Sequence, residues 1–339
     1  MSKLPAIFVR CIDGDAWESL IGRLDRWDYQ QGYCYSKRAA QTARQNIEAV
    51  AIFAEEMLVG LATARIRRIS FTPFRAAYVA AGPICSRAAG EQGFALCAEA
   101  LKRHFSTPTQ LLRVVPAAIT AEEAAAQTAT MAQLGYVRVP RPAYHTLNKR
   151  IDLSDTALQA SLRSNWRAHL TKSESEPLTV TGTGSDREFD AFDCMHRLLS
   201  LEKRFESGRG PAFFREVQRR ARLPERYSLR IAWAGDEAVA GHLGVITGMN
   251  ATVLLSAATD RGRAVRASYL LHWQFMTFAR DHGAVWLDLG GIDPAENPSV
   301  YSFKKGMRAE ELRWAGYFDH HPHRFPIRLL HRLEALARR

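Results

Sequence analysis

The stretch "WLDLGGIDPAENPSVYSFKKG", Trp286 to Gly306, gathers residue types that could do chemistry. It begins as an apolar strand, passes two glycines and a proline-containing turn, and ends in an aromatic residue, two lysines and a glycine. A strand that ends in glycine allows close approach of a ligand, and a lysine pair beyond it can neutralise a phosphate or an oxyanion. The alternative interpretation is a strand, a loop and a solvated helix end.

Two other segments indicate an internal repeat. The sequences "VAIFAEEMLVGLAT" (50–63) and "IAWAGDEAVAGHLG" (231–244) align without a gap at an offset of 181 residues. Each has a strand pattern, an acidic turn at Glu55–Glu56 or Asp236–Glu237, and a second strand pattern that contains glycine. Each segment therefore predicts a β-hairpin.

The two halves continue in the same order after these hairpins. A strand pattern, a loop with arginine and glycine, an amphipathic helix, a short apolar strand and a helix that ends in glycine follow in each. This order is that of a GNAT acyltransferase domain. We therefore predict an α/β (α+β) chain with two tandem GNAT-like domains, each a twisted mixed sheet flanked by helices. We place them at residues 1–150 and 151–319, with a C-terminal helix at 320–339 that packs back on the first.

The predicted domain boundary leads into a basic helix. Asp152 and Ser154 are helix-start signals, and Arg163, Arg167 and Lys172 follow at roughly helical spacing. These three cations are expected to share one face, which either contacts a polyanion or is solvated.

The C-terminal segment "RFPIRLLHRLEALARR" predicts another amphipathic helix. Phe325, Leu329, Leu333 and Leu336 recur on one side, and arginines on the other. We expect the apolar side to dock on the protein rather than on a membrane.

The composition is that of a globular protein with a basic surface. The 339 residues are 47% hydrophobic and 24% charged, with a formal net charge of +11. Excess Arg and Lys attracts polyanions such as nucleic acid, nucleotide-linked substrates and anionic membrane surfaces, although genome bias also produces such a composition. The start lacks a signal-peptide pattern, and no apolar run is long enough to span a bilayer. We expect a cytoplasmic monomer without membrane insertion; an RNA-binding module without enzymatic activity is favoured by charge alone.

Cysteine and histidine do not indicate a metal site. The five cysteines lack a CxxC pair and are expected to be reduced and mostly buried; they are Cys11, Cys34, Cys85, Cys97 and Cys194. His320, His321 and His323 form a group, but no cysteine or second histidine cluster completes a tetrahedral set. We predict no metal site.

The donor of a GNAT reaction can be an acyl-CoA. Acetyl-CoA enzymes of this fold hold the pyrophosphate on a loop of pattern Q/R-x-x-G-x-G/A, whose backbone N–H groups point at the anion. The second half has "RGRAVRAS", without glycines in register, whereas "RAAGEQ" (87–92) in the first half fails only at the last position. An N-acyltransferase that uses acyl-CoA or an acyl carrier protein is therefore the alternative function.

Several motifs together resemble the Fem family of peptidyltransferases (FemA, FemB and FemX types). The segment "WLDLGGIDP...VYSFKKG...WAGYFD" is similar to the family's aspartate-glycine-glycine strand, Phe-Lys pair, glycine and closing strand. The motif "AAGPI" resembles the family's Arg-Gly-Pro turn without its arginine, and "LRSNWRAHLTKSE" resembles the basic helix that opens its second domain. The resemblance spans most of the chain and is most specific at 288–306.

The resemblance implies transfer of an amino acid from aminoacyl-tRNA to an amine, often on a peptidoglycan precursor linked to a nucleotide or lipid. No cofactor is then needed beyond the two substrates. The first domain would lie on the acceptor side and the second on the acyl-donor side. The strand "ATVLLSAAT" lacks a tyrosine that the family often has there, which puts a muropeptide acceptor in doubt. The coiled-coil arm of some members is absent, as it is in FemX-like proteins.

Carried over residue by residue, Phe303 and Lys304 match the Phe-Lys pair beside the tRNA acceptor end. Lys304 would stabilise the developing oxyanion or the ribose leaving group. Arg204 matches an arginine that contacts the phosphate of the acceptor, and Lys37 or Arg38 matches an N-terminal lysine with the same role.

Other residues would bind the substrates. Gly290 and Gly291 would let the substrate approach the strand, and Lys305 would meet solvent or a phosphate. Asp288 is interpreted either as a general base for the amine or as a cap for nearby backbone N–H groups. The basic helix with Arg163, Arg167 and Lys172 would contact the tRNA.

Overall fold

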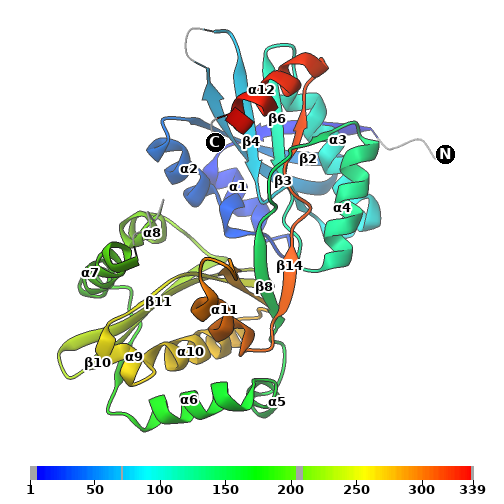
Figure 1. Ribbon diagram of the computed structural model, residues 1–339. Helices are drawn as coiled ribbons and strands as arrows, with labels where there is room; N and C mark the ends of the chain where they lie inside the picture. Colours follow the sequence, from blue (N-terminus) through cyan, green and yellow to red (C-terminus); the bar gives the residue numbers. More distant parts are fainter. Residues whose placement is uncertain (1–5, 70–71, 204–208, 337–339) are drawn as a thin grey trace. The chain divides into compact units, whose positions relative to one another are not determined.

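The computed structural model describes residues 6–69, 72–203 and 209–336, and the chain divides into two compact units (Figure 1). Unit 1 comprises Met1–Tyr144 and Leu312–Arg339, and unit 2 comprises His145–Glu311. Unit 1 is thus built from both ends of the chain. Within the described residues, no helix combines the length and apolar character that crossing a membrane requires.

Unit 1 is built on a mixed sheet in the order β1-β2-β3-β4-β6-β15-β7, with β5 paired to β3 beside that path. Its described ladders are antiparallel except for β4 and β6, which are parallel. The strands are β1 (Ile7–Ile12), β2 (Asn46–Ala54), β3 (Met57–Arg68), β4 (Arg75–Ala80), β5 (Ile84–Cys85), β6 (Gln110–Val115), β7 (Val137–Arg138) and β15 (Phe318–His320).

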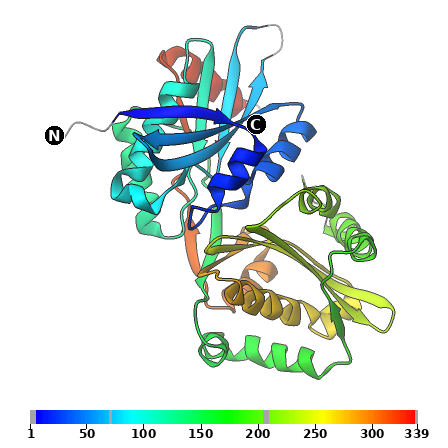
Figure 2. The same ribbon diagram turned by 180° about the vertical axis from the view of Figure 1, so that it is seen from behind.

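Helices cover both faces of this sheet (Figure 2). Val50 packs with Leu101 and Met131 of α3 and α4, whereas its neighbour Ala49 packs with Trp17 of α1. Successive strand residues point to opposite faces, so α3 and α4 cover one side and α1 the other. The helices are α1 (Gly14–Ile21), η1 (Tyr29–Gln31), α2 (Tyr33–Thr42), η2 (Arg87–Gln92), α3 (Gly93–Phe105), α4 (Ala121–Gln133) and α12 (Arg324–Leu336).

Unit 2 repeats this architecture with a sheet in the order β14-β8-β13-β12-β11-β10-β9. Among its described ladders only β12 and β13 are parallel. The strands are β8 (His145–Arg150), β9 (Thr179–Thr181), β10 (Glu225–Ala234), β11 (Glu237–Thr247), β12 (Asn250–Ala258), β13 (Trp286–Gly291) and β14 (Glu310–Arg313), whose last two residues belong to unit 1.

Two glycines of β11 let helices approach both faces of the second sheet. A Cβ at Gly241 would lie 2.3 Å from the ring of Phe192 in α7, and one at Gly244 would lie 2.2 Å from the ring of Phe275 in α10. These positions are three apart, so α7 and α10 cover opposite faces. The helices are α5 (Asp155–Ala160), α6 (Ser164–Ser175), α7 (Asp186–Lys203), α8 (Pro211–Gln218), α9 (Asp260–Ala264), α10 (Ala267–Asp281) and α11 (Pro298–Lys305).

Short polar side chains start several helices. Asp13, Thr120, Ser154 and Thr259 accept hydrogen bonds from backbone N–H groups in the first turns of α1, α4, α5 and α9. Each satisfies a donor that the helix itself leaves without a partner. Ser154, one of the two start signals expected to lead into the basic helix, instead starts the separate short helix α5. The basic helix α6 begins at Ser164, directly after Arg163.

Both predicted hairpins are present, but their equivalence differs by one residue from the sequence alignment. Val59 is the unpaired bulge residue of the β2–β3 ladder, and Val239 is the unpaired bulge residue of the β10–β11 ladder. Equivalent positions of the two hairpins are therefore 180 residues apart. Each turn begins with a left-handed residue, Glu55 (φ +55°) or Gly235 (φ +68°). The second turn is therefore Gly235–Asp236, and the predicted turn at Asp236–Glu237 is wrong.

The unit boundaries lie earlier than the positions expected at 150 and 319. Unit 1 ends at Tyr144 because β8 pairs with β13 of unit 2. Unit 2 ends at Glu311 because β15 pairs with β6 of unit 1. A buried ion pair supports the latter pairing: Arg113 of β6 donates at 2.7 Å to the fully buried Asp319.

The C-terminal helix is present, with a different buried side from the one predicted. Phe325 and Leu329 are 73% and 47% exposed, while Ile327 is buried. His331 contacts Asp319 at 3.0 Å and Glu334 accepts from Arg113 at 2.6 Å, so polar contacts hold much of this side. The side chains of Leu333 and Leu336 lie outside the described residues.

The expectation that most cysteines are buried is wrong. Cys97 is buried, whereas Cys34 and Cys85 are half-buried and Cys11 and Cys194 are exposed.

Candidate active site

A turn at the end of β13 is fixed by side-chain hydrogen bonds. The Asp288 carboxylate accepts from the Gly290 N–H at 2.7 Å and from the Thr146 hydroxyl of β8, which also lies 3.0 Å from the Gly290 carbonyl oxygen. Gly290 has φ +78°, and a Cβ there would lie 2.9 Å from the Val253 carbonyl oxygen. Glycine is therefore required at this position, and the carboxylate acts as the backbone cap that was one of its two interpretations.

Lys304 of α11 reaches the same turn. Its Nζ donates to the carbonyl oxygen of Gly290 at 3.1 Å and to that of Gly291 at 2.9 Å. Burial lowers the pKa of Lys304 to about 8, and the negative charge of Asp288 partly offsets this effect. Burial also raises the pKa of Asp288, although its hydrogen bonds and Lys304 oppose the change. The structure thus brings Lys304, Asp288, Gly290 and Gly291 together.

This cluster lies where the pairing of the two parallel strands ends. The β12–β13 ladder runs only from Asn250↔Trp286 to Thr252↔Asp288, although β12 continues to Ala258. Against β11, β12 also carries an extra residue, Leu254, and such bulges occur often beside active sites. The parallel ladder of unit 1, in contrast, is continuous from Arg75↔Gln110 to Ala80↔Val115. Among the ladders of the described residues, only the parallel ladder of unit 2 stops short in this way.

Phe303 is packed among aromatic rings. Its ring centroid lies 4.8 Å from that of Tyr269, 4.9 Å from that of His272 and 6.1 Å from that of Trp166. These partners come from α6 and α10, so Phe303 fixes the rotation of α11. Adjacent residues point about 100° apart on a helix, and this packing therefore directs Lys304 toward β13.

Two buried histidines that the sequence did not indicate, His272 and His242, lie behind Phe303. His272 Nδ1 lies 2.8 Å from the Ser268 carbonyl oxygen, and its ring centroid lies 4.5 Å from that of His242. Burial lowers the pKa of His272 to about 4 and also lowers the pKa of His242. Both imidazoles are thus neutral near pH 7. In the sequence, these residues could have been recognised only as histidines at core-facing positions of β11 and α10.

Lys305 points away from this turn. Its Nζ lies 3.3 Å from the Glu311 carboxylate, which also accepts from the Tyr301 hydroxyl and lies 3.2 Å from His145 Nε2. Glu311 is a third residue that the sequence did not indicate. The two lysines therefore have different surroundings, as the helical spacing predicts.

The basic helix has mixed roles. The Arg163 backbone N–H donates at 3.0 Å to the carbonyl oxygen of Gly306, which joins the start of α6 to the end of α11. The Arg167 guanidinium donates to the Leu162 carbonyl oxygen, while the side chains of Arg163 and Lys172 are exposed. The tRNA contact of this helix stays a prediction. Arg204 lies outside the described residues.

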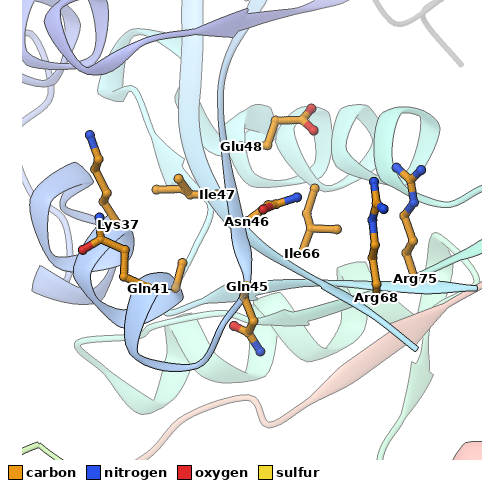
Figure 3. A pocket seen from close by; sticks show the side chains of 10 residues that line it. Lys37, Gln41, Gln45, Asn46, Ile47, Glu48, Ile66, Arg68 and Arg75 are labelled. Atoms are coloured by element: carbon orange, nitrogen blue, oxygen red, sulfur yellow. The ribbon is translucent and has the colours of Figure 1, made fainter. Parts of the chain in front are cut away.

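Unit 1 contains a cavity of about 490 Å³ (Figure 3). It offers three cationic side chains, those of Lys37, Arg68 and Arg75, together with amides and one carboxylate. Of the two alternatives in α2, Lys37 lines this cavity and Arg38 does not. The lining residues are Lys37, Ala40, Gln41, Gln45, Asn46, Ile47, Glu48, Ile66, Arg68 and Arg75.

Comparison with known proteins gives a family match and several structures with the same fold. Residues 221–334, about a third of the chain, match the model of the FemAB family. The solved structure of FemX superposes with a TM-score of 0.79 at 14% identity, over 96% of this chain and 100% of that one. No match was found among curated protein sequences.

Two more distant structures share the fold. A conserved protein of unknown function from Bacteroides thetaiotaomicron gives a TM-score of 0.56 at 10% identity, over 93% of this chain and 99% of that one. The C-terminal domain of a protein described as a lysylphosphatidylglycerol synthetase, from Agrobacterium fabrum, gives 0.51 at 12% identity, over 81% of this chain and 85% of that one.

The chain thus has the Fem-type tandem GNAT fold, and the family resemblance seen in its sequence is confirmed. The family match includes β13 and α11, which carry the turn and Lys304. Family match and fold together support a Fem-type transferase.

Proposed function

We propose that the protein moves an amino acid from aminoacyl-tRNA to an amine of a peptide, a peptidoglycan precursor or a natural product. The observation that carries this proposal is the position of Lys304, a partly buried cation where the β12–β13 ladder ends. The match of this segment to the FemAB family supports the donor class.

The reaction requires no covalent enzyme intermediate. The neutral amine attacks the ester carbonyl of the aminoacyl-tRNA, the C–N bond forms, and the bond between the carbonyl carbon and the ribose oxygen breaks. The amine loses a proton and the ribose hydroxyl gains one. A cation beside the reacting carbonyl stabilises the negative charge that develops on oxygen, and this is the role proposed for Lys304.

The unit 1 cavity is proposed to hold a phosphate of the acceptor. Lys37, Arg68 and Arg75 line it, and phosphate groups are bound well by such cations. The net charge of +11 would favour both the tRNA and a phosphate-linked acceptor. We propose a cytoplasmic enzyme that needs no cofactor.

An acyl-CoA or acyl-carrier donor remains the alternative, and one feature favours it. The short helix η2 (Arg87–Gln92) is interrupted at Gly90, which has φ +59°, and leads directly into the start of α3. The parallel ladder beside it in unit 1 is continuous, however, so it offers no opening for an acyl chain. In unit 2 the corresponding segment is the helix α9, which begins at Asp260.

The test is to incubate the protein with a mixture of radiolabelled aminoacyl-tRNAs, or with labelled acetyl-CoA, and with fractionated bacterial extract as the acceptor source. Label transfer from tRNA to an acceptor, lost in Lys304→Met, is the expected result. Transfer from acetyl-CoA alone would establish the alternative. RNA binding without consumption of either donor would indicate a binding module.

A further inference from the structure

Three side chains far apart in the sequence meet in unit 1, on a feature unrelated to Lys304. Cys11 lies on the edge strand β1, Glu48 on β2 and His104 in the last turn of α3. Their ligand atoms all lie within 4.8 Å of one another, and within the described part of the chain no other such group of three is found.

The spacing of these atoms is close to that of a tetrahedral metal site. Cys11 Sγ lies 3.4 Å from Glu48 Oε1 and 3.9 Å from His104 Nε2, and Nε2 lies 2.6 Å from Oε1. Tetrahedral bonds of about 2.0–2.3 Å place sulfur, nitrogen and oxygen ligands about 3.3–3.6 Å apart. An ion would therefore need small side-chain shifts, chiefly a separation of His104 from Glu48.

The same imidazole nitrogen faces both partners, which distinguishes this group from a nucleophilic triad. In a triad the histidine accepts the proton of the nucleophile through one ring nitrogen and contacts the carboxylate through the other. Here Nε2 of His104 faces both Cys11 and Glu48. The thiol of Cys11, the carboxylate of Glu48 and the imidazole of His104 thus converge on one point, as the ligands of a metal ion do.

The donor set selects the class of ion. Thiolate, imidazole and carboxylate together suit Zn²⁺ and related divalent transition ions rather than Mg²⁺ or Ca²⁺, which prefer oxygen ligands. Cys11 is exposed, and the side chains of His104 and Glu48 are 28% and 32% exposed. Solvent can therefore reach the site and supply a fourth ligand.

The neighbouring histidine group does not offer the same arrangement. His320 Nδ1 contacts the Ser106 hydroxyl at 2.8 Å, while His321 contacts the carbonyl oxygens of Pro108 and His323. These histidines face a serine hydroxyl and backbone carbonyl oxygens, and among the described residues they do not belong to a group of three ligand atoms that converge on one point.

We propose that unit 1 binds one divalent ion of the zinc class through Cys11, Glu48 and His104, with water as the fourth ligand. Binding deprotonates the thiol and joins β1, β2 and α3 through a single ion. The expected consequence is a more stable unit 1, because the ion binds only when the three elements are folded together.

The test is titration of the metal-free full-length protein with Co²⁺, followed by competition with Zn²⁺. We expect one equivalent of Co²⁺ to give the sulfur-to-cobalt charge-transfer band and the visible bands of tetrahedral cobalt, and Zn²⁺ to remove both. Zn²⁺ should also raise the midpoint of thermal unfolding. Cys11→Ser should abolish the charge-transfer band and His104→Gln should weaken binding at least tenfold.

Cys194→Ser, which removes another exposed thiol, is the matched control and should bind as the wild type does. The proposal is overturned if no one-to-one complex forms, or if Cys11→Ser and His104→Gln bind as tightly as the control. Transfer activity is not used as a readout, so failure of the aminoacyltransferase proposal would not affect this result.

Discussion

The ammonium of Lys304 donates a hydrogen bond of 2.9 Å to the carbonyl oxygen of Gly291, the last residue of β13. A second bond of 3.1 Å reaches Gly290. An ammonium group has three N–H donors, so these contacts fix the position of the cation and leave one donor for a substrate oxygen. The turn of β13 thus serves as the support of the proposed catalytic group.

Replacing Lys304 with Met should lower turnover by about 100-fold or more, equivalent to about 2.7 kcal/mol, because the charge that stabilises the oxyanion is lost. Turnover is measured at saturating donor and acceptor, and circular dichroism checks the fold. A rate near that of the wild type would contradict the proposed role.

Lys305→Met is the adjacent control. It removes an exposed ion pair with Glu311 and leaves the contacts at Gly290 and Gly291 in place. We expect a mild loss of donor affinity that is largest at low salt and shrinks as added salt screens the attraction to phosphate. Equal, near-wild-type turnover of the two variants at saturating donor and acceptor would mean that neither lysine contacts the reacting group.

The transfer rate should depend on the protonation of Lys304. Its pKa is lowered to about 8, so the cation is present below this pH and is lost as the pH rises above it. We expect turnover, corrected for spontaneous ester hydrolysis, to fall above about pH 8. Arginine keeps its charge at these pH values, so the residual turnover of Lys304→Arg should not fall above about pH 8. If turnover falls equally above about pH 8 in both proteins, deprotonation of Lys304 is not the cause.

Much of the fold could be predicted because local patterns determine it. Strand patterns, acidic turns and a glycine within each second strand indicated both hairpins, and the order of elements indicated two similar domains. The one-residue error at Gly235 arose because a gapless alignment matches residue types, whereas the turn depends on which residue adopts a positive φ. The final strand, β15, pairs with β6 across a separation of some 200 residues, and no local pattern carries that information.

The candidate site was only partly predictable for the same reason. Asp288 and Lys304 lie in one short motif, whereas Thr146 and His272 reach it from β8 and α10. The buried side of α12 was mispredicted because Phe325 suggested an apolar face, while the helix is held largely by polar contacts such as that of His331 with Asp319.

Gly290→Ala should destabilise unit 2 by about 1–3 kcal/mol, because alanine at φ +78° is strained and its Cβ would lie 2.9 Å from the Val253 carbonyl oxygen. Urea unfolding measures the change. Gly182→Ala is the control in the same unit, since its Cβ would meet the Leu229 carbonyl oxygen at an ordinary 3.4 Å. Equal stability of the two variants would show that the turn tolerates a side chain.

The buried His272 should make the protein less stable in acid. Burial lowers its pKa from 6.5 to about 4, so the unfolded chain binds more protons than the folded one between these values. Its contribution is therefore complete above about pH 6.5 and is lost as the pH falls toward 4. At about 1.4 kcal/mol per pH unit, the loss approaches 3 kcal/mol.

The measurement is the free energy of unfolding in urea at pH 7 and pH 4.5, for the wild type and for His272→Gln. Carboxylates contribute to the pH dependence of both proteins, so the difference between them isolates the histidine. The variant should be less stable at pH 7 because it loses the ring contacts with His242 and Phe303, yet it should lose less stability on acidification. His282→Gln, which changes an exposed histidine just beyond the same helix, should keep the pH dependence of the wild type. If His272→Gln loses as much stability between pH 7 and pH 4.5 as the wild type does, His272 does not cause the pH dependence. The neutral, buried state inferred for His272 is then wrong.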